Sequence, residues 1–98
     1  MSCEGFHVYI LKCSDDSYYV GLSNHLKQRL EVHNSGNGPR FTASRLPVVL
    51  AYSEPFRDLE SAVKRERQIK KWTRAKKEAL IRGDFATLKM LSKKRETQ

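Results

Sequence analysis

The sequence predicts a single α+β domain with a small sheet early in the chain and helices over most of the remainder. Two segments that alternate apolar and polar residues, 6–12 and 18–22, flank a short polar turn, which is typical of a β-hairpin. A third apolar segment follows at 48–53, and three helical patterns come after it. A chain of 98 residues is long enough for one domain with its own core.

The turn of the hairpin is predicted at 14–16, where the sequence is Ser-Asp-Asp. A three-residue loop would pair Cys13 with Ser17. It would also place Asp16 in the left-handed conformation, which Gly, Asn and Asp tolerate better than other residues.

This register sets Tyr9 opposite Gly21 and Leu11 opposite Tyr19. Because side chains on a strand alternate between its faces, the two tyrosines then lie diagonally on one face of the hairpin. We expect Gly21, which has no side chain, to leave open space above the strand at Tyr9.

The first helix is predicted to start near His25, with Ser23 or Asn24 as its capping residue. The segment 34–39 is rich in Gly and Asn and closes with a proline, so it ends the helix. Residues 40–45 are predicted to form a loop.

The continuous apolar run at 48–53 predicts a strand that is buried on both faces. A second helix should follow with Asp58 as its cap. We expect an inward-facing stripe on this helix formed by Leu59, Ala62, Val63 and Ile69.

Two more helices are predicted after a break at 72–73. Thr73 caps a helix that ends at Gly83, and Asp84 caps a short final helix. The inward-facing residues of the final helix are predicted to be Phe85, Leu88 and Leu91. The remaining segment, 93–98, is predicted to be a frayed basic tail.

The charge is strongly positive, with a formal net charge of +8 at pH 7. Most of the excess lies at 64–77 and in the C-terminal tail, and such a field attracts polyanions. We expect nucleic-acid contacts from Lys64, Lys70, Lys71 and Arg74. The longest apolar run is too short to span a membrane, and the N-terminus lacks the features of a signal peptide, so we expect a cytoplasmic protein.

Glu66 is unusual because it falls within the inward-facing stripe of the second helix, where Leu or Ile is expected. A carboxylate in such a position has to be paired, protonated or bound to a metal. Two interpretations remain open on this pattern: an ion pair with one of the many nearby cations, or a ligand for Mg²⁺, which often takes only one or two carboxylates.

The two tyrosines could simply fill the core, as aromatic residues in strands often do. As a pair on one face they could instead serve acid–base chemistry, provided that nearby positive charge lowers a phenol pKa. Arg29 and His33 are neighbours on one helix face. Arg29 could bind a phosphate or be solvated, and His33 could relay a proton or be partly buried.

The ordered set of these residues resembles the GIY-YIG nuclease superfamily, and most closely its small stand-alone bacterial members. His7-Val8-Tyr9 resembles the first motif of the family, and Tyr19-Val20-Gly21 resembles the second. The resemblance covers about residues 6–82, which leaves a C-terminal helix and basic tail at 83–98. Its functional positions map to Tyr9, Tyr19, Arg29, His33 and Glu66.

The resemblance implies a three-stranded antiparallel sheet flanked by helices, and a metal-dependent endonuclease that hydrolyses DNA phosphodiester bonds with little sequence specificity. One tyrosine, which we expect to be Tyr9, would activate water. Arg29 would neutralise phosphoryl charge, and Glu66 would hold Mg²⁺ or Mn²⁺. We expect a monomer without a small-molecule cofactor. The alternatives are a non-catalytic nucleic-acid-binding module on the same scaffold and a protein-interaction domain with a basic face.

Overall fold

The computed structural model describes residues 5–96, with side chains described through residue 92. The described chain is an α+β fold with a three-stranded antiparallel sheet and five helices. In chain order the elements are β1 Phe6–Lys12, β2 Tyr18–Ser23, α1 Leu26–Asn34, α2 Arg40–Ala43, β3 Val49–Phe56, α3 Leu59–Lys70, α4 Arg74–Arg82 and α5 Phe85–Glu96. Within this range, no helix combines the length and the apolar composition that a membrane crossing requires.

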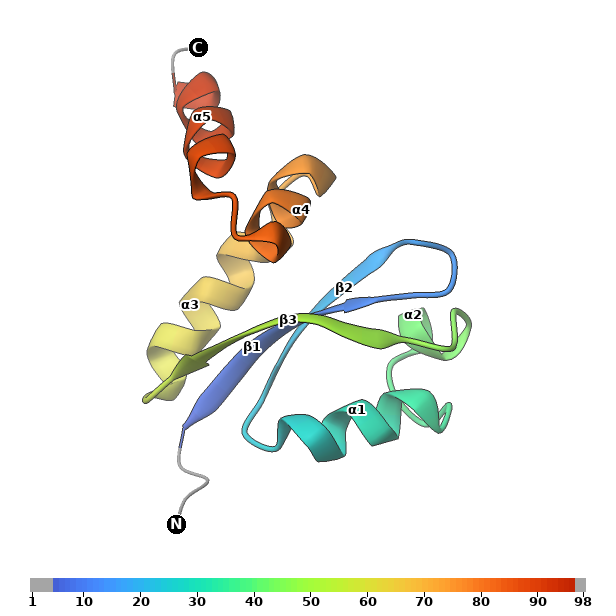
Figure 1. Cartoon of the computed structure of the whole chain (residues 1–98). Helices are drawn as coiled ribbons and strands as arrows, with labels where there is room; N and C mark the ends of the chain where they lie inside the picture. The colour runs from blue at the N-terminus through green and yellow to red at the C-terminus, as the bar shows by residue number, and fades with distance from the viewer. Residues whose placement is uncertain (1–4, 97–98) are drawn as a thin grey trace.

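The strand β1 lies in the middle of the sheet, between β2 and β3. Its residues from Val8 to Leu11 are all buried, because helices cover both faces of the sheet. Val8 and Ile10 pack in a cluster with residues of α3, and Tyr9 and Leu11 pack in a second cluster with residues of α1. Figure 1 shows α1 and α2 on one side of the sheet and α3 on the other, with α4 and α5 leading away from it.

The hairpin has the predicted register. Tyr9 pairs with Gly21, and Leu11 pairs with Tyr19. The backbone N–H of Cys13 donates to the carbonyl of Ser17 at 2.9 Å. Asp16 adopts the left-handed conformation with φ of 69°. The turn residues therefore place both tyrosines on the face of the sheet that α1 covers.

The predicted caps of the last three helices are confirmed. Side-chain oxygens of Asp58 and Thr73 accept hydrogen bonds from backbone N–H groups in the first turns of α3 and α4. Asp84 accepts from the N–H of Thr87. Gly83 ends α4 in the left-handed conformation with φ of 73°. These local signals set the boundaries of the helical half of the chain.

The predictions around α1 and α2 are wrong in two respects. The residue before α1 is His25, whose side chain makes no capping hydrogen bond. Ser23 instead accepts a hydrogen bond from the N–H of His25, so it shapes the turn before the helix. The predicted loop at 40–45 contains the short helix α2, which Pro39 precedes. Proline favours this start because its backbone is already restricted to a helix-compatible φ.

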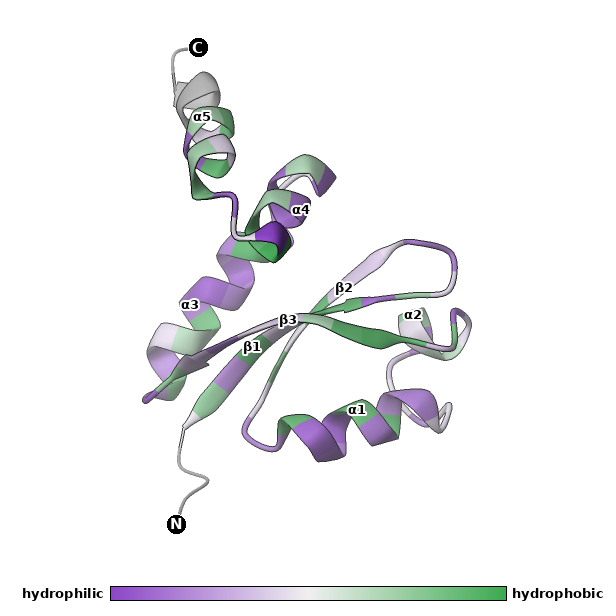
Figure 2. Cartoon of the chain, viewed as in Figure 1, coloured by the Kyte–Doolittle hydropathy of each residue, from purple (hydrophilic) through white to green (hydrophobic). Residues whose placement is uncertain are grey.

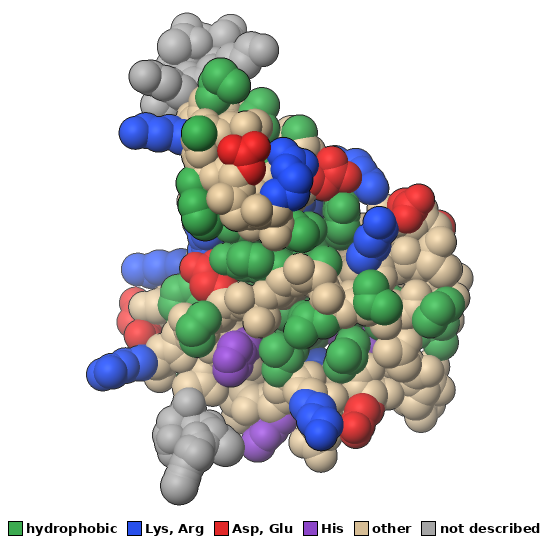
Figure 3. All heavy atoms as spheres, in the orientation of Figure 1, with side chains coloured by type: hydrophobic (Ala, Val, Ile, Leu, Met, Phe, Trp, Pro, Cys, Tyr) green, Lys and Arg blue, Asp and Glu red, His purple; other side chains and the backbone are tan. Residues whose placement is uncertain are grey.

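The third strand is β3 (Val49–Phe56) rather than 48–53, and it is not buried on both faces. It pairs only with β1 and forms an edge of the sheet. Val49 is 57% exposed and Leu50 is 40% exposed. Figure 3 shows hydrophobic side chains gathered across the face that β3 crosses, with cationic side chains around the rim. The apolar run correctly indicated a strand but not its burial. Burial depends on which strands and helices lie beside β3, and the run itself does not specify them.

Two predicted core residues are also exposed. Leu59 lies in the first turn of α3 and is 50% exposed, and Phe85 begins α5 and is 61% exposed. Both lie at the N-terminal ends of their helices, while Ala62 and Ile69 of α3 are fully buried as predicted. Figure 2 shows the alternation of hydrophobic and hydrophilic residues along α1.

The helix α5 continues to Glu96, through most of the predicted tail, and residues 97–98 lie outside the described residues.

Candidate functional site

The two tyrosines meet His33 beneath α1. The Tyr9 hydroxyl lies 3.1 Å from Nε2 of His33. The Tyr19 ring centroid is 6.5 Å from that of Tyr9 and 5.2 Å from that of His33. Tyr9 is 1% exposed and His33 is fully buried, whereas Tyr19 is half-buried. The hairpin register and one turn of α1 therefore bring these three rings together.

The space above Gly21 is filled, not open as expected. A Cβ on Gly21 would lie 2.5 Å from Cζ of Tyr9 and would overlap its hydroxyl. The hydroxyl can reach His33 only because Gly21 has no side chain. Gly21 is therefore required for the position that the Tyr9 hydroxyl occupies.

The other ring nitrogen of His33 is bonded to Thr42 of α2. The distance from Nδ1 to the Thr42 Oγ1 is 2.8 Å, and Thr42 is fully buried. The same hydroxyl donates to the backbone carbonyl of Pro39 at 3.2 Å. Both nitrogens of the imidazole therefore have fixed partners, which holds the ring in one orientation.

Arg29 and Glu66 are close enough to influence the Tyr9 hydroxyl. Burial raises the pKa of Tyr9 to about 12, and negative charge on Tyr19 and Glu66 raises it as well, while Arg29 opposes these effects. Burial also lowers the pKa of His33, and the positive charge of Arg29 lowers it further. At neutral pH the pair is therefore a neutral phenol hydrogen-bonded to a neutral imidazole.

Glu66 is partly buried on α3 and pairs with Lys70, one turn later. The Nζ–Oε2 distance is 3.2 Å, and the side chains of Lys70 and Glu66 are 52% and 18% exposed. An ion pair of this exposure contributes only about 0.3–0.5 kcal/mol, so it does not account for an inward-facing carboxylate. Among residues 5–92, no three His, Cys, Asp or Glu side chains cluster as metal ligands would. A single carboxylate still fits Mg²⁺, which commonly keeps several waters and takes oxygen from a bound phosphate.

The four predicted nucleic-acid contacts have different environments. Lys64 is exposed and lies 3.9 Å from Glu60, and Lys70 pairs with Glu66. Arg74 donates to the carbonyl of Asp16 and to Glu78, and its guanidinium lies over the ring of Tyr18. Arg74 therefore joins α4 to the hairpin, and its side chain is less available to a phosphate than the sequence indicated.

Lys71 and Lys64 instead line a hollow of about 430 Å³ on the outer side of α3. Arg67, Gln68 and Trp72 complete its lining. The cations stand one and two turns apart, along a face of α3 that turns away from the buried residues. Two or more phosphates of a nucleic-acid backbone could be contacted here, and we call this surface the α3 basic face.

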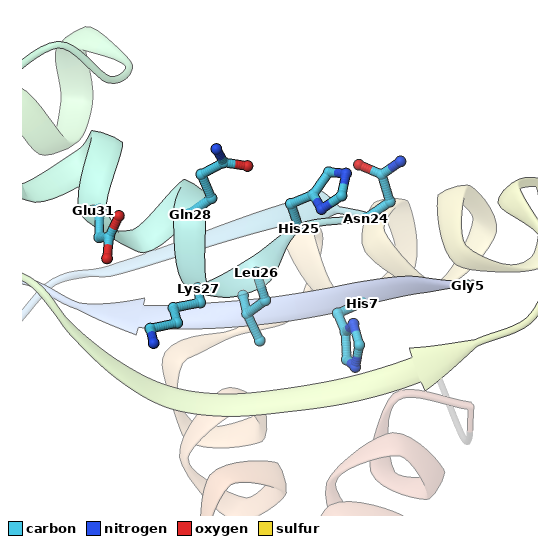
Figure 4. Close-up of a pocket in the computed structure, with 8 residues that line it drawn as sticks. All are labelled: Gly5, His7, Asn24, His25, Leu26, Lys27, Gln28 and Glu31. Carbon is cyan, nitrogen blue, oxygen red and sulfur yellow. The ribbon is translucent and has the colours of Figure 1, made fainter. Parts of the chain in front are cut away.

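Two further hollows lie at the start of α1. Arg29 lines one of about 250 Å³ together with Ser23 and Val32. The other, of about 350 Å³, lies between His7 and polar residues of α1 such as Glu31 (Figure 4). Neither of these two hollows is lined by Tyr9, Tyr19, His33 or Glu66.

Sequence reasoning missed Thr42, Arg67 and Gly38, at which a Cβ would lie 3.2 Å from Nδ1 of His33. Thr42 and Gly38 lie in the stretch interpreted as a helix end and a loop, where no periodic pattern indicates a contact. Arg67 belongs to the cationic run, but only the spacing along α3 relative to Lys64 and Lys71 could have placed it on their face.

The chain is similar to several known proteins. The family model described as the GIY-YIG catalytic domain matches residues 5–79. A UPF0213 protein of Halobacterium salinarum is 43% identical over 75 residues, which cover 76% of this chain and 97% of that protein. A UPF0213 protein of Clostridium perfringens is 48% identical over 75 residues, which cover 76% of this chain and 81% of that protein.

Two solved structures are also similar. The solution NMR structure of a protein from E. faecalis matches with a TM-score of 0.59 and 34% identity, over 85% of this chain and 88% of that one. The solution NMR structure of a UPF0213 protein from Bacillus halodurans matches with a TM-score of 0.53 and 36% identity, over 79% of this chain and 82% of that one.

Proposed function

Because the chain belongs to the GIY-YIG catalytic domain family, a family of nucleases, we propose that it is a metal-dependent endonuclease that hydrolyses DNA phosphodiester bonds with little sequence specificity. The observation that carries this proposal is the buried hydrogen bond between Tyr9 and His33, 3.1 Å long, with the charges of Arg29 and Glu66 acting on Tyr9. A phenol, an imidazole, a guanidinium and a carboxylate together provide a base, a phosphate ligand and a metal ligand.

Tyr9 and His33 would act together as the base. As a water oxygen attacks phosphorus, Tyr9 takes a proton from the water and passes its own phenolic proton to Nε2 of His33. The pair then holds one extra proton, on His33, and the bond from phosphorus to the leaving 3′-oxygen breaks. His33 suits this role because its lowered pKa keeps Nε2 free to accept at neutral pH.

Arg29 and Glu66 would act on the phosphate. Arg29 is exposed, and its guanidinium would bind non-bridging oxygens in pairs. Glu66 would hold Mg²⁺ or Mn²⁺, which when bound supplies a Lewis acid for the developing charge on phosphate and on the leaving oxygen. Since Tyr9 is buried, the substrate must approach from the side where Tyr19 and Arg29 are accessible.

Contacts to phosphate alone would hold the nucleic acid. The α3 basic face offers Lys64, Arg67 and Lys71, and none of these requires a particular base. Recognition of this kind gives strong salt dependence and little sequence preference, as the proposal requires.

A second function, a nucleic-acid-binding module without hydrolysis, is favoured by the environments of Tyr9 and Glu66. Tyr9 is almost fully buried, with a pKa of about 12, and Glu66 is paired with Lys70. If these contacts persist when a nucleic acid binds, the base and the metal ligand are both inactive.

The test is cleavage of duplex, flapped and branched DNA, and of RNA, with Mg²⁺ or Mn²⁺, by the wild type and Glu66→Gln. Glu60→Gln is a matched control, because Glu60 also pairs with a lysine one turn later on α3. We expect Glu66→Gln to lose cleavage by orders of magnitude and Glu60→Gln to retain it. Both should keep their free energy of unfolding within about 0.5 kcal/mol.

Three results would count against the proposal. Equal cleavage by Glu66→Gln and the wild type would remove Glu66 from the site. Binding without cleavage by the wild type, with every substrate and metal, would support the module instead. A large loss of stability in Glu66→Gln, without a similar loss in Glu60→Gln, would indicate that the role of Glu66 is structural.

A further inference from the structure

We propose that Thr42 is a positioning residue that fixes the tautomer of His33, so that Nδ1 carries the proton and Nε2 accepts from Tyr9. This inference rests on the proposed function for its catalytic meaning, but the tautomer itself can be measured without any substrate. It concerns a residue of the short helix α2, which lies outside the ordered set of motif residues.

The hydrogen-bond chain crosses three elements. Tyr9 of β1 bonds to Nε2 of His33 at 3.1 Å, and Nδ1 of His33 bonds to the hydroxyl of Thr42 at 2.8 Å. All three side chains are buried, with exposures of 1%, 0% and 0%. No buried polar side-chain atom in the described residues lacks a partner, so water is not needed to complete the chain.

The donor and acceptor roles in this series of hydrogen bonds follow from its last members, Thr42 and Pro39. A hydroxyl carries one proton, and Thr42 has the carbonyl of Pro39 at 3.2 Å as a partner that can only accept. With its proton donated to Pro39, the Thr42 hydroxyl accepts from Nδ1 of His33, which is the arrangement that the positioning role requires. A neutral imidazole has a single N–H, so its Nε2 is unprotonated and the Tyr9 hydroxyl donates to it.

The loop before α2 supports this arrangement sterically. A Cβ on Gly38 would lie 3.1 Å from Cα and 3.2 Å from Nδ1 of His33. The backbone at Gly38 therefore packs closely against the Nδ1 edge of the ring. Together with Pro39, which orients the acceptor carbonyl, it leaves Nδ1 no partner but Thr42 among the described residues.

A purely structural role for Thr42 makes a different prediction. A buried threonine that merely satisfies its own hydroxyl through Pro39 would leave the tautomer of His33 to Tyr9 alone. The Tyr9 hydroxyl can donate or accept, so it does not select a tautomer. Under the positioning role, removing the Thr42 hydroxyl releases Nδ1 and lets the proton move to Nε2, where it would donate to Tyr9.

The experiment measures the ring nitrogens of His33 by NMR of ¹⁵N-histidine-labelled protein near pH 7.5, with His33→Gln to assign its signals. In the wild type we expect protonated Nδ1 and unprotonated Nε2. Thr42→Ser, which keeps the hydroxyl, should keep this pattern. Thr42→Val, which has nearly the same shape without a donor or acceptor, should shift His33 toward protonated Nε2.

Cleavage by the same variants gives the second readout. Thr42→Val should lower kcat/KM by about 100-fold, at the lower end of what a positioned base contributes, and Thr42→Ser should restore most of it. Melting temperatures are measured in parallel. A decrease in kcat/KM that is fully explained by a lower melting temperature would indicate a structural role for Thr42.

The outcomes separate the two proposals. A wild-type His33 protonated at Nε2 would overturn the inference even if Thr42→Val does not fold. An unchanged tautomer in folded Thr42→Val would overturn it as well. If the tautomers behave as expected but the wild type cleaves nothing, the positioning role stands and the proposed nuclease function fails.

Discussion

Replacing Tyr9 with Phe removes one buried oxygen and leaves the ring in place. The change deletes the 3.1 Å hydrogen bond to His33 and leaves Nε2 without a donor in a buried site. An orphaned buried acceptor costs about 1–3 kcal/mol, so we expect the free energy of unfolding at pH 7 to fall by that amount. Cleavage should fall by about 10²- to 10⁴-fold, since the phenolic base is gone.

The stability difference should depend on pH. The folded pKa of Tyr9 is raised from 10.0 to about 12, chiefly by burial. Between these values the unfolded chain ionises and the folded chain does not, so stability that is present below pH 10 is lost as pH rises to about 12. Two pKa units correspond to about 2–3 kcal/mol. Tyr9→Phe lacks this component, so its curve should approach that of the wild type at high pH.

Urea unfolding followed by the fluorescence of Trp72 measures the loss of stability at pH 7 and its change up to pH 11.5. Tyr52→Phe serves as a control for cleavage, because its hydroxyl bonds to Glu54 on the edge strand at 2.9 Å, outside the tyrosine–histidine cluster. It should cleave normally. A Tyr9→Phe protein as stable as the wild type at pH 7, with a constant difference up to pH 11.5, would refute the buried hydrogen bond.

Three more predictions follow from the same geometry. Gly21→Ala should destabilise by about 1–3 kcal/mol and abolish cleavage, because the added methyl overlaps the Tyr9 hydroxyl; near-normal unfolding and activity would contradict this. Burial lowers the pKa of His33, so the stability present above about pH 6.5 should be lost as pH falls through the lower folded pKa, and His33→Gln, measured by urea unfolding, should flatten that dependence. DNA affinity should fall steeply with salt, and Lys71→Ala on the α3 basic face should reduce the log–log slope by about 0.9; an unchanged slope would exclude this contact.

Much of the fold could be predicted from local sequence. The turn at 14–16 determined the hairpin register, because Asp16 tolerates φ of 69° and only one loop length pairs Cys13 with Ser17. The caps at Asp58 and Thr73 were equally predictable, since a capping side chain bonds to backbone only three residues away. Signals of this kind depend only on residues that are close in sequence, so they can be recognised without the tertiary structure.

Burial was less predictable. The apolar run that includes Leu50 predicted a strand buried on both faces, yet β3 is an edge strand and β1 is the buried one. Alternation shows which residues share a face, but it does not show the order of the strands or which faces the helices cover.

The sequence alone determined the order of Tyr9, Tyr19, Arg29, His33 and Glu66 along the predicted strands and helices, and this order predicted that they belong to one site. Their catalytic roles stay predictions. Only the tertiary structure decided how the tyrosine and histidine are connected. Tyr9 bonds to His33 across 24 positions, and His33 bonds to Thr42 across a loop that had no pattern. A hydrogen bond between residues distant in sequence requires tertiary packing to bring both partners together, and for Tyr9, His33 and Thr42 the packing of α1 and α2 on the sheet does this.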